Sequence, residues 1–178
     1  MTGTLAAKCV LRVMTALALL GLSGCASEGP PPSGPPTFYR NLAEGGQLDP
    51  SAAQSMISGY RGNNGLGAVT LDPDLMKLAE EHSRTMAARD KLDHDVGKAC
   101  SQRIRGGRLD AKVAVENISA GYHTLAEAFS GWRDSPPHRA NMLNKGVTRM
   151  GIAAIYSPKS KYKVFWTLIL AAPDDKRG

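Results

Sequence analysis

The chain has 178 residues, enough for one domain and a targeting segment but hardly for two domains. A composition of 42% hydrophobic and 21% charged residues excludes wholesale disorder. The formal net charge of +6 comes without a basic run or an aromatic-interleaved basic patch, so we expect no nucleic-acid partner, although a mild attraction to anionic lipid or cell-wall surfaces remains open.

The first 24 residues have the organisation of a signal peptide. Basic residues precede an apolar run at residues 13–22, which is too short to cross a hydrocarbon core that needs about 20 residues. The run ends in Leu22-Ser23-Gly24-Cys25, which resembles the lipobox of bacterial lipoproteins, where the cysteine is acylated and the bond before it is cut. We therefore predict a signal peptide at residues 1–24 and a lipid anchor on Cys25. The alternatives are an ordinary signal peptide that contains a cysteine and a membrane anchor that is never cleaved.

A proline-rich stretch follows the predicted lipid anchor. Residues 28–36 read EGPPPSGPP, and such a sequence favours a stiff spacer of about 3 Å per residue. We predict a linker at residues 25–37 and a single, monomeric domain at residues 38–178. The anchor places this domain in the cell envelope, on the outer membrane or its periplasmic face if the host has two membranes.

Helix start signals are the clearest local patterns of the domain. Asp49-Pro50 predicts a helix that runs to about Tyr60, and Asp72-Pro73 predicts a second helix, because an N-cap followed by proline is a typical first turn. The second helix has one continuous stripe for burial, made of Leu75, Leu78, Ala79, His82 and Met86. Thr124 and Glu127 form a capping-box pattern at the start of a third helix, and a short helical turn is predicted after Ser135.

Strands are expected only near the C-terminal end. Residues 93–112 are polar and rich in glycine and arginine, which predicts a long surface loop. Met150–Tyr156 and Tyr162–Leu170 have strand patterns, and the second is apolar on both faces, so we expect it to be central in a sheet. Helices before and between such strands indicate an α+β fold.

Three stretches together resemble the CAP superfamily (SCP domain), which includes cysteine-rich secretory proteins, antigen 5 and plant pathogenesis-related proteins. They are residues 75–94, Val115-Glu116-Asn117-Ile118, and the most specific one, WRDSPPHRANML at residues 132–143. The match is to the disulfide-free bacterial branch and covers about residues 50–172. This resemblance implies a three-layer α-β-α sandwich that carries a cleft lined by two histidines and two glutamates.

The resemblance carries over to three cleft residues. His94 and His138 match the family histidines and Glu116 matches the first glutamate, whereas Asp134 or Ser135 stands where the second glutamate is expected. His94 and His138 would be ligands for zinc or another divalent metal, with Glu116 as a third ligand, as a residue that orients the ligands, or as a catalytic general base. At a helix start, His138 should have a lowered pKa that favours its neutral form. The alternative is a hydrogen-bonded polar cluster that fixes the loop between the second and third helices.

Other polar residues have structural interpretations. His82 lies on an apolar stripe, where we expect a core histidine that is hydrogen-bonded to the backbone. Arg103 and Arg105 could lower the pKa of Cys100, but no base accompanies this thiol, and we interpret it as incidental. Asn117 is expected to bond the backbone in a turn.

Three functions are compatible with these residues. The first is a module that binds a lipid, a cell-envelope component or a protein partner through the His/Glu cleft. The second is a metal-dependent envelope hydrolase, and the third is a structural lipoprotein with a vestigial site. The absence of a matching second glutamate favours the binding module.

Overall fold

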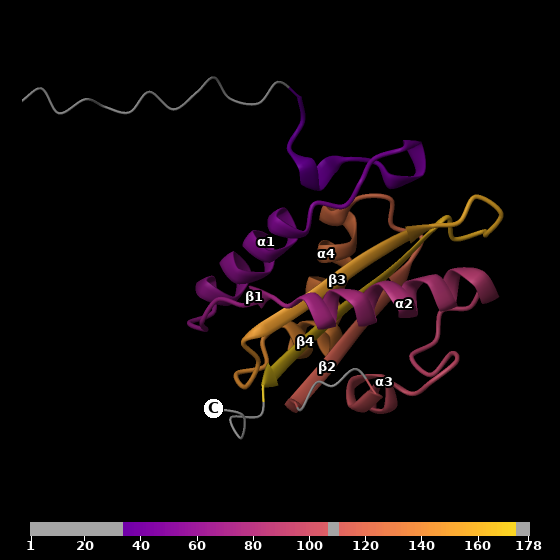
Figure 1. Ribbon diagram of the computed structural model, residues 1–178. Helices are drawn as coiled ribbons and strands as arrows, with labels where there is room; N and C mark the ends of the chain where they lie inside the picture. The colour runs from indigo at the N-terminus through magenta and orange to yellow at the C-terminus, as the bar shows by residue number, and fades with distance from the viewer. Residues whose placement is uncertain (1–33, 107–110, 174–178) are drawn as a thin grey trace, which may run out of the picture. The chain divides into compact units, whose positions relative to one another are not determined.

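The computed structural model describes residues 34–106 and 111–173 (Figure 1). The signal peptide, the lipid anchor on Cys25 and most of the linker lie outside these residues, so they remain predictions of the sequence. In the described part of the chain, no helix is both long enough and apolar enough to cross a membrane.

Four strands form one mixed sheet in the order β1-β3-β4-β2. The strands are β1 (Thr70–Leu71), β2 (Ala111–Ala120), β3 (Arg149–Tyr156) and β4 (Val164–Pro173). β1 runs parallel to β3, whereas the β3–β4 and β2–β4 pairs are antiparallel. The strand that is apolar on both faces, β4, lies inside the sheet, which confirms its predicted central position.

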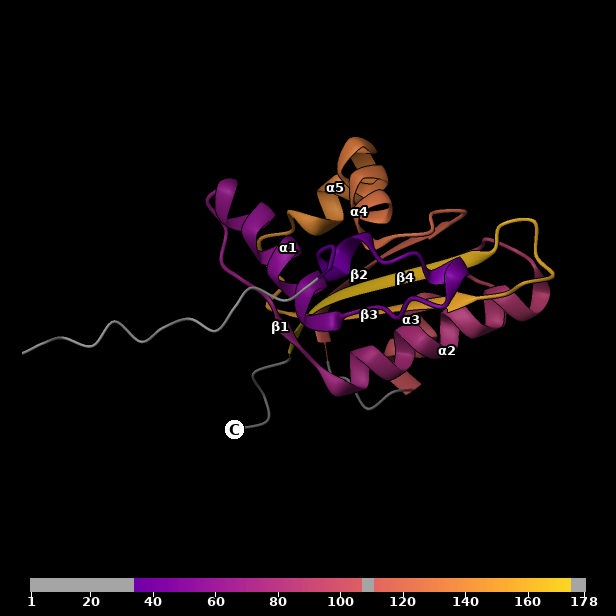
Figure 2. The same cartoon turned by 90° about the horizontal axis from the view of Figure 1, so that it is seen from above.

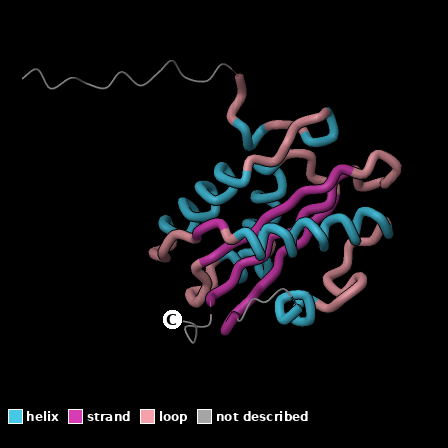
Figure 3. The backbone as a smooth tube through the Cα atoms, in the orientation of Figure 1, coloured by secondary structure: helices cyan, strands magenta, loops and turns pink. Residues whose placement is uncertain are grey.

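Helices cover both faces of the sheet, as Figures 2 and 3 show. The helices are α1 (Pro50–Asn63), α2 (Pro73–Arg89), α3 (Cys100–Gly106), α4 (Leu125–Asp134) and α5 (Pro136–Met142), and two 3-10 turns at Thr37–Tyr39 and Leu42–Glu44 precede α1. α1, α4 and α5 share one face, where Trp132 packs edge to face on Trp166 of β4 at 6.5 Å between ring centroids. α2 and α3 share the opposite face. The α+β fold and its α-β-α layers are thereby confirmed.

The helices begin where their capping residues predict. The side chains of Asp49 and Asp72 accept backbone N–H groups of the first turns of α1 and α2, and Thr124 forms a reciprocal capping box with Glu127 at α4. The predicted stripe of α2 is buried throughout.

α2 lies so close to the sheet that β3 has no room for a side chain at one point. A Cβ atom added to Gly151 would lie 2.1 Å from the carbonyl carbon of Leu75. The glycine therefore allows the backbone of α2 to rest directly on β3, which fixes the height of α2, and of His82 on it, above the sheet.

The prediction of a loop over residues 93–112 was wrong in its second half. Residues 100–106 form α3, and β2 begins at Ala111 and was not predicted. α3 was hidden because one of its buried residues is Arg103, and β2 because two polar residues interrupt its alternation. Asn117 accordingly lies in a strand and not in the predicted turn.

Candidate functional site

The centre of the site is Glu116, in the middle of β2. Because side chains alternate across a strand, Glu116 lies with Ile118 on the face that α2 and α3 cover, and only 2% of its side chain is exposed. Arg103 of α3 donates a hydrogen bond to Oε2 and forms a buried ion pair with Glu116. The same guanidinium donates to the backbone oxygens of His94, at 2.8 Å, and Lys98. Arg103 therefore neutralises the carboxylate and ties the segment before α3 to β2.

His94, between α2 and α3, binds the other carboxylate oxygen. Its Nδ1 lies 2.9 Å from Oε1 of Glu116, and 50% of its side chain is exposed. The hydrogen bond to Glu116 raises the pKa of His94, because the carboxylate favours the imidazolium form. Burial raises the pKa of Glu116, but the hydrogen bonds from His94 and Arg103 outweigh burial and hold this pKa below its ordinary value. The carboxylate is therefore ionised at neutral pH.

A third basic residue, His82 of α2, also faces Glu116. Its Nε2 lies 3.7 Å from Oε1 of Glu116, its exposed fraction is 1%, and neither ring nitrogen has a hydrogen-bond partner. The predicted hydrogen bond from His82 to the backbone is thus wrong. Burial lowers the pKa of His82, which keeps the imidazole neutral near pH 7. The only sequence signal for its role was a histidine at a buried position of an apolar stripe.

His138 lies on α5, at the opposite side of β2. Its backbone oxygen accepts a 2.9 Å hydrogen bond from Asn117, and Asn141 donates to the backbone oxygen of Glu116 at 3.0 Å. α5 is therefore fastened to β2 at the position of the buried carboxylate. The pKa of His138 is lowered as predicted, but burial is the first cause and the nearby His94 the second.

The donor set does not fit a zinc site with three protein ligands. Both oxygens of Glu116 are already bound, one by the cation of Arg103, and a guanidinium beside the carboxylate opposes a second, divalent charge. Asp134, which stands where a second family glutamate is expected, is exposed and pairs with Arg133. Within the described ranges no group of three or more histidine, cysteine or acidic side chains is placed to hold a metal.

Cys100, at the start of α3, is not a reactive thiol. Burial raises the pKa of Cys100 to about 11, with the charge of Glu116 acting in the same direction. The lowering expected from Arg103 is outweighed, and Cys100 stays protonated at neutral pH. It packs with the apolar cluster of α2 and α3.

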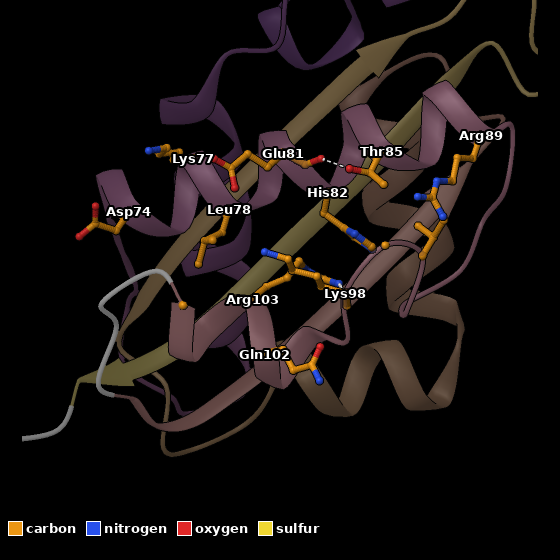
Figure 4. Close-up of a pocket in the computed structure, with 13 residues that line it drawn as sticks. Asp74, Lys77, Leu78, Glu81, His82, Thr85, Arg89, Lys98, Gln102 and Arg103 are labelled. Carbon is orange, nitrogen blue, oxygen red and sulfur yellow. Dashed lines mark hydrogen bonds between the residues drawn. The ribbon is translucent and has the colours of Figure 1, made fainter.

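A cleft of about 710 Å³ opens between α2 and the segment that includes α3 (Figure 4). We call it the α2–α3 cleft. His82 and Arg103, which both face Glu116, line it, whereas His94 and His138 are not among its lining residues. Its exposed lining carries charges of both signs. The buried cluster around Glu116 thus supports one side of an open cavity of the size of small-molecule sites.

Comparison with known sequences points to one family. The profile of the CAP family, described as the cysteine-rich secretory protein family, matches residues 54–170. The chain is 30% identical over 120 residues to the uncharacterized protein YkwD of Bacillus subtilis, covering 60% of this chain and 47% of YkwD. It is also 30% identical over 94 residues to the uncharacterized membrane protein YlbC of the same organism, covering 52% and 27%. The chain therefore spans less than half the length of these curated relatives.

Solved structures share the fold. An extracellular SCP-domain protein from Bacillus anthracis superposes with a TM-score of 0.61 at 24% identity, covering 68% of this chain and 39% of that one. An outer surface protein from Borrelia burgdorferi gives a TM-score of 0.62 at 19% identity, covering 72% and 98%. At these identities the likeness establishes the fold alone.

Proposed function

This chain belongs to the CAP (cysteine-rich secretory protein) family, and on that premise we propose that it is a cell-envelope binding module, anchored through a lipidated Cys25, that holds a lipid, another envelope component or a protein partner in the α2–α3 cleft. The lipobox-like sequence before Cys25 supports the anchor. The extracellular and outer-surface proteins that share the fold support a location outside the cytoplasm.

One observation carries this proposal: the carboxylate that a hydrolase would need is already engaged. A general base must be free to take a proton, yet Glu116 is buried, bound on both oxygens and paired with Arg103. The same cluster leaves an open cleft beside it. A carboxylate whose oxygens are already bound, beside a cavity that is open, favours the binding of a ligand over the catalysis of a reaction.

We expect material from the cell envelope to protect the α2–α3 cleft from hydrogen exchange. The full chain in detergent micelles is mixed with fractions of envelope extract, and exchange is followed by mass spectrometry. Peptides from α2 and from residues 94–106 should gain protection. Glu81→Trp should abolish the protection, because Glu81 is exposed and lines the cleft. Glu44→Trp is the matched control, since Glu44 is also exposed and lies outside the cleft.

The proposal is contradicted if no fraction of the envelope extract changes the hydrogen exchange of the domain. Protection that survives Glu81→Trp would also contradict it, because the ligand would then lie elsewhere on the domain.

The alternative is a metal-dependent envelope hydrolase that uses His94 and His138 as ligands and Glu116 as base. We expect zinc, titrated by calorimetry into the metal-stripped full chain, to show no micromolar binding that depends on the two histidines, because the third ligand is engaged by Arg103. His94→Ala and His138→Ala are titrated beside the unaltered chain, after circular dichroism has shown that both are folded. Micromolar binding that is lost in both variants would instead establish a working metal site and make a hydrolase screen the next step.

A further inference from the structure

The charged side chains of the α2–α3 cleft are distributed unevenly along α2. Toward the N-terminal end of the helix, Asp74 and Glu81 flank Lys77, so charges of both signs lie together. Arg89 stands at the C-terminal end and Lys98 faces α2 from the segment before α3, as Figure 4 shows. Both are exposed, and in the described part of the chain neither side chain has an ion-pair or hydrogen-bond partner.

Two residues with polar atoms that lack partners line the same cleft as these two cations. His82 is 1% exposed with both ring nitrogens unbonded, and the Nε of buried Arg103 also lacks an acceptor. Figure 4 shows His82 extending from α2 toward the segment that carries Lys98 and Arg103. Buried donors left unpaired are costly, and beside an open cleft they indicate a ligand that accepts hydrogen bonds.

An oxyanion would supply the negative charge and the hydrogen-bond acceptors that this end of the cleft lacks. Carboxylates and phosphates accept hydrogen bonds at every oxygen, match the planar fork of an arginine and attract the point charge of a lysine. A cavity of about 710 Å³ also leaves room for the uncharged remainder of a small ligand. Aliphatic or cationic ligands would leave Arg89 and Lys98 uncompensated.

We propose that the α2–α3 cleft binds a ligand that carries a carboxylate or phosphate group, and that this group lies between Arg89 and Lys98, above His82. The inference rests on the proposed binding function and names the chemistry of the ligand. In this arrangement His82 and Arg103 form the buried side of the same subsite.

The test measures the binding of two probe anions to the full chain in a non-ionic detergent by calorimetry. Pyrophosphate represents the phosphate source and citrate the carboxylate source. Arg89→Ala and Lys98→Ala should each weaken binding about tenfold, since each removes one charged contact to the oxyanion. Both residues are exposed, so the variants should keep their fold, which circular dichroism checks. Lys145→Ala removes an equal charge from an exposed site outside the cleft and should leave the affinity unchanged.

The two probes separate the sources of the oxyanion. Binding of pyrophosphate alone indicates a phosphate ligand, and binding of citrate alone a carboxylate ligand. Binding of neither probe, or equal weakening in Lys145→Ala, overturns the inference. If envelope material still protects the cleft in that case, the proposed binding function stands without the oxyanion subsite. If instead the probes bind through Arg89 and Lys98 but no envelope material protects the cleft, the subsite stands and the proposed function fails.

Discussion

Replacing Arg103 with alanine is expected to lower the free energy of unfolding by about 3–5 kcal/mol, the usual cost of removing one partner of a buried ion pair. The exposed fractions of the two side chains are 8% for Arg103 and 2% for Glu116, so water does not replace the lost cation. The variant also loses the hydrogen bonds to the backbone oxygens of His94 and Lys98. The carboxylate is then left charged in the interior, where the hydrogen bond with His94 remains.

Urea denaturation followed by tryptophan fluorescence measures this loss, because Trp132 and Trp166 are buried in the core. Arg105→Ala is the matched control: Arg105 lies on the same helix and is exposed, so its removal should change stability by less than about 0.5 kcal/mol. The difference between Arg103→Ala and the unaltered chain should shrink as the pH falls below the ordinary pKa of glutamate. The lowered pKa of Glu116 stabilises the fold fully above the ordinary value, and this stabilisation is lost as the pH falls further, through the lowered pKa of Glu116; Arg103 is one source of the lowering.

A double variant tests the reason for the loss. Arg103→Ala combined with Glu116→Gln removes both charges, so it should recover part of the stability that Arg103→Ala alone loses. If the double variant is no more stable than the single one, the lost packing and backbone contacts of Arg103, and not the orphaned carboxylate, explain the effect.

The sequence predicted the parts of this fold that depend on local rules. Asp49, Asp72 and Thr124 marked helix starts because a capping side chain bonds backbone only two or three residues away. The stripe of α2 and the doubly apolar β4 were found because periodicity alone decides which face is buried. α3 and β2 were missed since their buried positions hold Arg103, Glu116 and Asn117, which local rules assign to the surface.

The site was predicted less completely for the same reason. The proximity of His94 and Glu116 followed from a family resemblance, and the structure brings these two side chains into hydrogen-bond contact. Arg103 and His82, which complete the surroundings of the carboxylate, lie 13 and 34 positions away along the chain. Neither hydrophobic periodicity nor helix capping relates residues that are so far apart in the sequence. For His82 the available signal was a basic residue at a position that helical spacing assigns to the core, whereas Arg103 gave no such signal because its helix, α3, was not predicted.

Arg61 of α1 is a second instance of this signal. It follows Ala53 and Ile57 at steps of four, so it occupies the buried stripe of the helix, and its exposed fraction is 2%. Its guanidinium donates to the backbone oxygens of Gly67, at 2.8 Å, and of residues 142, 144 and 147, at 2.7, 2.9 and 3.1 Å. One side chain therefore fastens α1 to the connection between α5 and β3. Burial lowers the pKa of Arg61, yet a guanidinium remains protonated in proteins.

Arg61→Ala is expected to lower the free energy of unfolding by about 4 kcal/mol or more, because it leaves buried carbonyl oxygens without a donor at about 1–3 kcal/mol each. Arg84→Ala removes an exposed arginine whose ion pair, among the described residues, is with Glu80 at i−4, and it should cost about 0.5 kcal/mol or less in the same urea titration. Arg61→Lys should recover only a part of the lost free energy of unfolding, since one ammonium group cannot reach all the carbonyl oxygens that the planar guanidinium contacts. Hydrogen exchange should rise first in α5, whose Asn141 bonds the backbone of Glu116, so the loss at α1 reaches the site. If α5 keeps its protection in Arg61→Ala, Arg61 stabilises the fold without positioning the residues around the carboxylate.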